Sequence, residues 1–217
     1  YTSEYIPIEK IGIHPNGTVF IGMQSCNQCH LDIVNAHKQT AHWLTSSKIT
    51  SATVIPFLNS DKNYFDLKDQ TRLSFSIKND TLFQEAYRRP YKSPFFTKSI
   101  DINIGSGTKI GNSFLSWEEN SLFQLQGSYY KPKSKWINSP GYPSFFQPKR
   151  PIFPRCLECH TTFSQSENWQ SAIPTNRYNK ENIVFGIDCQ RCHGPVVDHV
   201  KHHRKNPIDS VGRKILS

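Results

Sequence analysis

Three five-residue segments of the chain share one pattern: Cys26–His30 (CNQCH), Cys156–His160 (CLECH) and Cys189–His193 (CQRCH). C-x-x-C-H is the pattern of covalent attachment of a c-type haem. Two thiols on one helical turn can form thioether bonds to the two vinyl groups of a haem, and the adjacent imidazole then lies under the iron. The sequence therefore predicts three covalently attached c haems. Their attachment residues would be Cys26, Cys29, Cys156, Cys159, Cys189 and Cys192, and their proximal iron ligands would be His30, His160 and His193.

Three other uses of paired cysteines explain less of this pattern. A zinc ribbon needs two C-x-x-C pairs, which leaves one pair over and gives no reason for the histidines. Disulfides are a second alternative, but this spacing is typical of redox-active pairs rather than structural ones. An iron–sulfur cluster would need four cysteines close together. With nine histidines in 217 residues, three chance placements directly after a cysteine pair have a probability of about one in ten thousand.

The composition fits a protein that is built around prosthetic groups. Hydrophobic residues make up 36% of the chain, against about 45–50% in typical globular domains, a range that includes glycine. Three haems would supply the missing core. The formal charge of +9 would fall to about +6 once six propionates and three ferric porphyrin cores are counted. The remaining basic charge favours an acidic partner protein over nucleic acid.

Six further histidines are candidates for distal ligands of the haem irons: His14, His37, His42, His199, His202 and His203. The single methionine, Met23, lies three residues before Cys26 and is too near that attachment site to reach the opposite face of the same haem. Bis-histidine ligation is therefore expected, and it generally gives lower reduction potentials than His/Met ligation.

Spacing ranks these candidates. A helix predicted over residues 31–42 places His42 about 18 Å from His30, which favours a different haem for His42. After the third motif, Pro195 can start a new helix. The last three histidines share one face of that helix, and one or two of them are expected to bind iron. His14, in a turn, and His37 fit packing or surface roles equally well.

The motifs resemble those of the multihaem cytochromes c typified by the tetrahaem electron carrier of ammonia-oxidising bacteria. Gly22–His30 followed by His42 is similar to the opening of that family, and Cys156–Thr162 with Gly186–His199 is similar to its paired motifs. The resemblance implies that His42 and His199 are distal ligands. Two departures stand out, since His37 occupies a position where relatives often have tryptophan and a fourth C-x-x-C-H is absent. The chain also stops where relatives often continue to further haem motifs, so we expect a fragment or one subunit of a larger haem array.

The stretch after His42 has no cysteine or histidine up to residue 130. Apolar and polar residues alternate in four segments, which predicts antiparallel strands at Tyr64–Leu67, Leu73–Ile77, Ile100–Ile104 and Leu122–Leu125. Turn-forming residues at 78–80 and 105–107 separate them. We therefore expect a β-rich insertion over residues 51–130.

Residues 131–155 contain six of the 14 prolines, six Lys or Arg, five aromatic residues and no acid. Such a segment suits an extended chain that wraps haems and pairs with propionates, and a solvated loop is the alternative. The predicted fold is α+β with little regular secondary structure and with helices at the haem motifs. One haem-organised domain, 1–217, would consist of a first haem segment (1–50), the insertion (51–130), a Pro-rich basic wrap (131–155) and a second and third haem segment (156–217).

These features predict a trihaem c-type cytochrome that passes electrons through closely packed, mainly bis-His haems, and that is an electron carrier rather than an enzyme. The alternatives are the haem-bearing subunit of a multihaem oxidoreductase acting on small nitrogen or sulfur compounds, and a subunit of a cytochrome filament. Covalent haem attachment occurs outside the cytoplasm, so the expected location is periplasmic or extracellular, with a lipid anchor left open.

The expected partners are redox proteins with an acidic docking face, and further cytochrome subunits. Residues 131–155 and the tail 201–217, which has five Lys or Arg and one Asp for a net charge of +4, would attract such partners. No run of 18 apolar residues is present, so no membrane span is expected. The chain begins with Tyr1 and no apolar signal core follows, as expected of a mature or trimmed chain.

Overall fold

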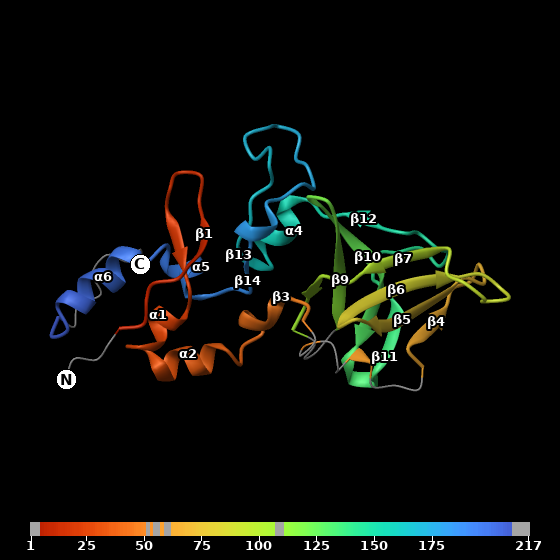
Figure 1. Ribbon diagram of the computed structural model, residues 1–217, viewed down its shortest axis with the longest axis horizontal. Helices are drawn as coiled ribbons and strands as arrows, with labels where there is room; N and C mark the ends of the chain where they lie inside the picture. Colours follow the sequence, from red (N-terminus) through yellow and green to blue (C-terminus); the bar gives the residue numbers. More distant parts are fainter. Residues whose placement is uncertain (1–4, 51–52, 54–56, 59–61, 107–110, 210–217) are drawn as a thin grey trace.

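The computed structural model describes residues 5–50, 53, 57–58, 62–106 and 111–209. The three motifs lie together in one half of an elongated molecule, and two β-sheets form the other half (Figure 1). This mixed architecture of short helices and antiparallel strands confirms the α+β prediction.

The half with the motifs is built from the two ends of the chain. Its N-terminal elements are a hairpin of β1 (Lys10–Ile13) and β2 (Val19–Ile21), the helices α1 (Gln24–Asn27) and α2 (Leu31–His37), the 3-10 turn η1 (Trp43–Thr45) and β3 (Ser46–Lys48). Its C-terminal elements are α4 (Pro154–Glu158), β13 (Thr161–Phe163), η4 (Lys180–Asn182), β14 (Val184–Phe185), α5 (Cys189–His193) and α6 (Val197–Lys205). The two ends lie side by side, so residues far apart in sequence share one region (Figure 1).

The other half contains two antiparallel sheets. The smaller has the strand order β4 (Tyr64–Asp66), β5 (Arg72–Lys78), β6 (Thr81–Tyr87), β7 (Phe96–Ser99). The larger has the order β11 (Lys135–Asn138), β10 (Ser121–Tyr130), β9 (Asn112–Glu118), β8 (Ile102–Ile104), β3, and β12 (Arg150–Pro151) also pairs with β10. The turn η3 (Lys131–Lys133) joins β10 to β11.

The four strands predicted by alternation are confirmed as β4, β5, β8 and β10, and Gly105 has a turn conformation with φ +105. Strands β6, β7, β9 and β11 were not predicted. Two of them bury polar side chains, such as Gln84 and Glu85 in β6 and Ser116 in β9, which interrupts the simple alternation of apolar and polar residues.

The larger sheet has a hydrophobic core on each face, because adjacent residues of a strand point to opposite sides. Phe114 and Leu125 face the smaller sheet and belong to the core of the β-sandwich, together with Phe75 and Trp136. Leu115 faces the other way and packs with Leu157 of α4. The second C-x-x-C-H motif is therefore mounted on the outer face of the sandwich.

Residues 131–151 contribute to the sandwich. Lys135–Asn138 pairs with the end of β10, and Trp136 is buried in the sandwich core. The Tyr142 hydroxyl donates to the Gln124 carbonyl, and the Arg150 guanidinium bonds to the Gln124 side chain and lies over the Tyr142 ring. These contacts hold the first part of the Pro-rich segment against β10. The segment continues into α4, which carries the second motif.

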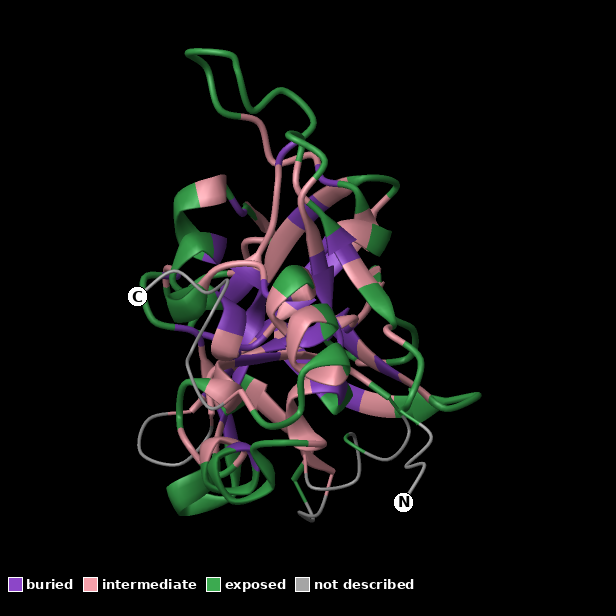
Figure 2. Ribbon diagram, turned by 90° about the vertical axis from the view of Figure 1, so that its left-hand side faces the viewer, coloured by how far each residue is buried: buried purple, intermediate pink, exposed green. Residues whose placement is uncertain are grey.

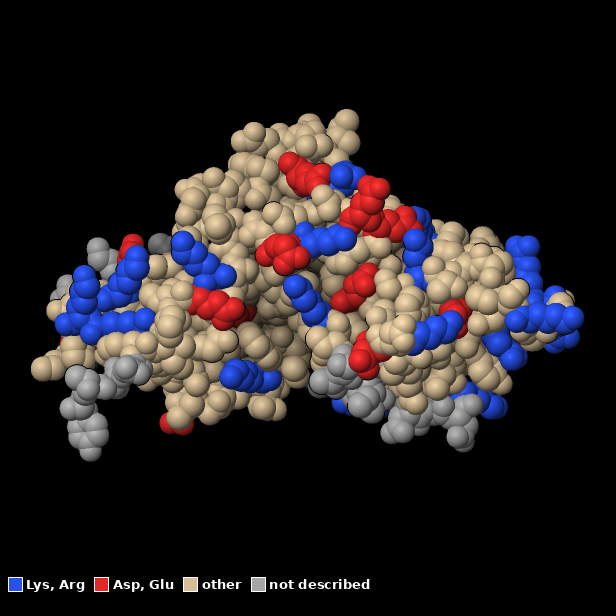
Figure 3. All heavy atoms as spheres, in the orientation of Figure 1, with Lys and Arg blue, Asp and Glu red and all other residues tan. Residues whose placement is uncertain are grey.

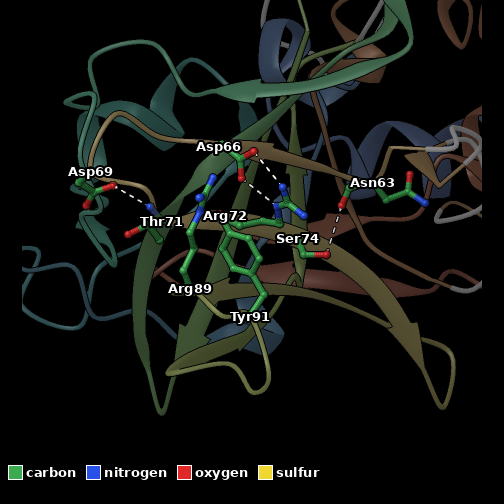
Figure 4. A network of polar contacts seen from close by, with 8 residues as sticks. All are labelled: Asn63, Asp66, Asp69, Thr71, Arg72, Ser74, Arg89 and Tyr91. Atoms are coloured by element: carbon green, nitrogen blue, oxygen red, sulfur yellow. Dashed lines mark hydrogen bonds and ion pairs between the residues drawn. The ribbon is translucent and has the colours of Figure 1, made fainter.

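Arg72 of β5 contacts the edge strand β4 and Tyr91 in the connection between β6 and β7 (Figure 4). Its guanidinium donates to both carboxylate oxygens of Asp66 at 2.8 and 2.9 Å, and it lies 3.9 Å from the Tyr64 ring centroid and 4.5 Å from that of Tyr91. The hydrogen bond from Arg72 lowers the pKa of Asp66. Asp69 accepts from the Thr71 N–H at 3.1 Å and closes the turn between β4 and β5.

Glu85 gives the β-half a pH-dependent contribution to stability. Burial alone would raise the pKa of its carboxyl group, but hydrogen bonds from Lys78, Ser76 and Tyr87 outweigh burial and lower it. A carboxylate with a lowered pKa in the folded state stabilises the fold above its unfolded value, here 4.5, and loses this contribution as the pH falls.

We therefore expect Glu85→Gln to lower the free energy of unfolding by about 1–2 kcal/mol at pH 7, and the difference from the parent should shrink as the pH falls below 4.5. Urea unfolding followed by circular dichroism at a series of pH values measures this. Glu167→Gln, which breaks a more exposed pair with Arg177, is the control and should show a smaller difference. A difference that is constant from pH 3 to 7 would contradict the role of the Glu85 charge.

Candidate haem attachment sites

Each C-x-x-C-H motif starts on a short helix. In the first motif Cys26 lies in α1, and the His30 N–H donates to the Cys26 carbonyl at 2.9 Å. The second motif begins in α4, which has Pro154 in its first turn, where the missing N–H costs nothing. The third motif is α5 itself, and Asp188 caps its N-terminus by accepting from the Gln190 N–H at 2.8 Å. One helical turn therefore places both thiols of each pair on the same side.

The attachment residues are accessible. The sulfur-bearing side chains of Cys29, Cys156, Cys159 and Cys192 are exposed, and those of Cys26 and Cys189 are partly buried. His30 and His193 are also exposed. Large apolar side chains lie uncovered beside the motifs, including Leu31 (53% exposed) and Ile33 (67%) after the first and Phe153 (42%) before the second. In Figure 2 the helices of this half are largely exposed, whereas the buried residues concentrate in the sheets behind them.

The first and third motifs are fastened to each other. The Gln190 side chain accepts from the Ile21 N–H at 3.0 Å and donates to the Ile21 carbonyl at 2.8 Å, so α5 is bonded to the strand that precedes the first motif. The Cys26 and Cys189 thiols are close neighbours, and their interaction raises the pKa of Cys26 and lowers that of Cys189. Cys26 of the first motif and Cys189 of the third therefore lie next to each other.

Helix α6 brings His199 to the first motif. The His30 and His199 ring centroids are 6.4 Å apart, and the ring planes differ by 16°. Arg204 holds the helix there by donating to the Gln28 side chain at 2.7 Å and to the Ile6 carbonyl at 2.8 Å. Val196 and Val200 pack on Ile21. His199 follows the third motif in sequence but faces the proximal histidine of the first.

The other two histidines of α6 have different surroundings. His202 Nε2 bonds to the Asp209 carboxylate at 3.0 Å. The His203 ring centroid lies 4.5 Å from that of His199, and His203 Nε2 is buried without a hydrogen-bond partner among the described residues. A buried nitrogen with no partner is costly, so this atom fits a position next to an acceptor or a metal ion that the chain itself does not provide.

His37 and His42 both lie beside the third motif, around Ile187. His37 Nε2 is 2.7 Å from the Ile187 carbonyl, and the Ile187 N–H donates to the His42 carbonyl at 3.0 Å. The predicted helix over residues 31–42 is wrong in length, because α2 ends at His37. The Thr40 hydroxyl donates to the His37 carbonyl and accepts from the Trp43 N–H, which replaces the helical pattern by a turn. The exposed side chain of His42 thus leaves from a turn next to the third motif.

His160 of the second motif is half-buried, and burial lowers its pKa. Its Nδ1 lies 2.8 Å from the Thr45 hydroxyl oxygen, so Nε2 is the ring nitrogen left for a metal ligand. His14 also approaches this motif. It lines a cavity of about 330 Å³ together with Pro154 and Glu158 of the α4 helix, and its ring centroid is 5.7 Å from that of Phe163.

A small polar junction joins all three motif regions, and its members are Thr45, Ser46, Thr162, Gly186 and Asp188. The Ser46 hydroxyl bonds to the His160 carbonyl and accepts from the Gly186 N–H at 2.9 Å. The Thr162 hydroxyl donates to the Gly186 carbonyl at 2.7 Å and accepts from the Asp188 N–H at 2.8 Å. The C-x-x-C-H pattern does not specify the residue type at Thr45, Ser46 or Gln190, so the sequence did not predict their roles.

Within the described ranges, no three His, Cys, Asp or Glu side chains converge as a metal-binding cluster, so the cysteines of the second and third motifs do not form the four-thiol arrangement of a zinc ribbon. No helix among those residues is both long and apolar enough to cross a bilayer.

Two comparisons relate the chain to cytochromes. Residues 130–194, which include the second and third motifs, match the family model of cytochrome c554 and c-prime. The crystal structure of the outer cell wall cytochrome OcwA is similar to this chain with a TM-score of 0.53 and 17% identity, covering 91% of this chain and 35% of OcwA. The chain thus spans about a third of that cytochrome and shares its fold over this part. No curated protein matches the chain in sequence.

Proposed function

We propose that the chain is a trihaem c-type cytochrome that transfers electrons between redox partners. Three C-x-x-C-H motifs, the match of the second and third to the cytochrome c554 family model and the similarity in fold to a cytochrome support the proposal. The single observation that carries it is the pair His30 and His199. Metal–nitrogen bonds to imidazole are about 2 Å long. When two imidazoles bind one metal ion from opposite sides, their bound nitrogens are therefore about 4 Å apart and their ring centroids about 6 Å apart. The observed 6.4 Å matches this spacing.

The side chains at the motifs fit covalent haem. At least one thiol of each pair is exposed, large apolar side chains beside the motifs are uncovered, and His203 Nε2 has no hydrogen-bond partner among the described residues. A chain whose porphyrins cover these positions would show these features. When bound, haem c supplies a one-electron carrier whose potential depends on axial ligands, burial and hydrogen bonds. The chain holds it through the six cysteines and through His30, His160 and His193.

The distal ligands follow from where each histidine lies. His199 would complete the first site, with His203 as its neighbour. His42, which leaves the turn beside Ile187, is the candidate next to the third motif, and His14 is the candidate next to the second. His37 and His202 use Nε2 in hydrogen bonds to Ile187 and Asp209, which favours supporting roles for both.

The arrangement suits electron transfer. Contact between Cys26 and Cys189 would place the first and third haems close to each other, and the polar junction links both to the second. Lysine and arginine side chains gather at the end of the molecule that carries α6 (Figure 3), where Lys201 and Lys205 are exposed. This surface would steer an acidic redox partner to the first haem. Since OcwA is an outer cell wall cytochrome by name, and since haem c is attached outside the cytoplasm, we place the chain in the periplasm or outside the cell.

Removal of one cysteine pair tests the proposal. The purified holoprotein should contain three haems per chain by the pyridine haemochrome assay, and Cys156→Ala/Cys159→Ala should contain two. Ferric spectra should be low-spin, and the ferrous form should bind little carbon monoxide. A chain without covalent haem would overturn the proposal. A high-spin haem in the parent that binds carbon monoxide readily would favour an oxidoreductase instead.

A further inference from the structure

A threonine from the first motif region contacts the proximal histidine of the second. Thr45 Oγ1 lies 2.8 Å from His160 Nδ1, although the two residues are 115 positions apart in sequence. Both side chains are partly buried, so water competes only weakly for this contact. A histidine that binds a metal through Nε2 keeps its proton on Nδ1, and that proton needs an acceptor.

The backbone around Thr45 is held from several directions. The Gly105 N–H donates to the Thr45 carbonyl at 2.7 Å, and the Thr45 N–H donates to the His42 carbonyl at 3.2 Å. The next residue, Ser46, pairs with Ile104 in the larger sheet, and its hydroxyl bonds to the backbone carbonyl of His160. The Thr45 hydroxyl is therefore fixed in place relative to the His160 ring.

We propose that Thr45 is a positioning residue for the second haem, accepting a hydrogen bond from His160 Nδ1–H. The inference rests on the proposed function, because it takes His160 as an iron ligand. An acceptor on Nδ1–H fixes the tautomer and ring orientation and makes Nε2 more basic. A more basic ligand stabilises ferric over ferrous iron, so Thr45 lowers the reduction potential of this haem relative to the same site without it.

Thr45→Val tests the inference, because valine keeps the shape of threonine and removes the hydroxyl. In a spectroelectrochemical titration of the holoprotein, one of three components should shift to higher potential and the other two should stay in place. The expected size is about tenfold in the equilibrium constant for reduction, which is about 59 mV for one electron. In electron paramagnetic resonance one of the three low-spin ferric signals should change. Thr45→Ser, which retains a hydroxyl, should restore most of the parent potential.

Thr50→Val is the matched control. It makes the same substitution five residues later, at an exposed hydroxyl that lies 3.3 Å from the Thr53 hydroxyl rather than beside a motif histidine. All three potentials should remain at parental values in this variant. Unchanged potentials in a Thr45→Val protein that holds three low-spin haems would overturn the inference, as would equal shifts in both valine variants. If the parent itself lacks three covalent haems, the proposed function fails before Thr45 is tested.

Discussion

His199→Ala is expected to convert one of the three haems from six-coordinate low-spin to high-spin iron. His199 lies opposite His30 with 6.4 Å between ring centroids, so its removal would leave the first haem with one protein ligand. The ferric spectrum should gain a high-spin component of about one third of the haem, and the ferrous protein should bind about one carbon monoxide per chain. Optical and electron paramagnetic resonance spectra of the holoprotein measure both.

The matched control for this experiment is His202→Ala on the same helix. His202 is bonded to Asp209 at 3.0 Å and should leave all haems low-spin. His203 needs its own test, because its ring lies 4.5 Å from that of His199 and could move into the vacated position. If His199→Ala stays low-spin, the double variant with His203→Ala decides the matter. A double variant that still shows only low-spin haem would contradict the assignment of α6 to the first site.

Whether a feature of the sites could be predicted from the sequence depends on how far apart in sequence the interacting residues are. The C-x-x-C-H motifs are local, since one helical turn carries both thiols and the histidine, and their pattern is visible without a fold. Partners across the molecule are not local. His199 follows the third motif yet faces the first, a relation set by Arg204, Gln28 and the packing of Val200 on Ile21. Thr45 has no distinguishing neighbours in sequence, and threonine is too common for its role to be inferred.

The β-half shows a similar division. Strands with simple alternation were predicted: the predicted segment Leu73–Ile77 lies within β5 (Arg72–Lys78), and the turn predicted at residues 78–80 joins β5 to β6. Asn112–Glu118 was missed because Phe114 and Leu115 are both buried, one on each face of a sheet that is covered on both sides. Alternation of apolar and polar residues identifies strands that have one solvent-exposed face, so it cannot identify a strand that is buried on both faces. The Pro-rich segment was also hard to place, since only the three-dimensional structure shows Trp136 inside the sandwich core.

Trp136→Ala is expected to produce the largest loss of stability in the β-half. The indole is 3% exposed and stacks on Phe75 with 3.5 Å between ring centroids and 5° between planes. It also contacts Phe114 and Tyr129, and its Nε1–H donates to the Phe57 carbonyl at 3.1 Å. Truncation of a buried tryptophan to alanine costs about 3–5 kcal/mol, because the cavity that remains collapses only in part. In a domain of this size such a loss lowers the melting temperature by about 10 °C.

Far-ultraviolet circular dichroism during thermal unfolding of the holoprotein measures this change. The haem absorption at room temperature should stay parental, since β11, the strand that contains Trp136, lies in the half away from the motifs (Figure 1). Trp169→Ala removes a side chain that is 53% exposed and is the matched control, with an expected change within about 0.5 kcal/mol. Trp136→Phe keeps an aromatic ring for the stack and removes the hydrogen bond to Phe57, at about 1 kcal/mol. If Trp136→Ala does not fold, Trp136→Phe can be measured in its place. A Trp136→Phe protein that is less stable than Trp169→Ala would support the position of the Trp136 ring in the core. A Trp136→Ala protein that is as stable as Trp169→Ala would contradict the contribution of the Trp136 ring to the sandwich core.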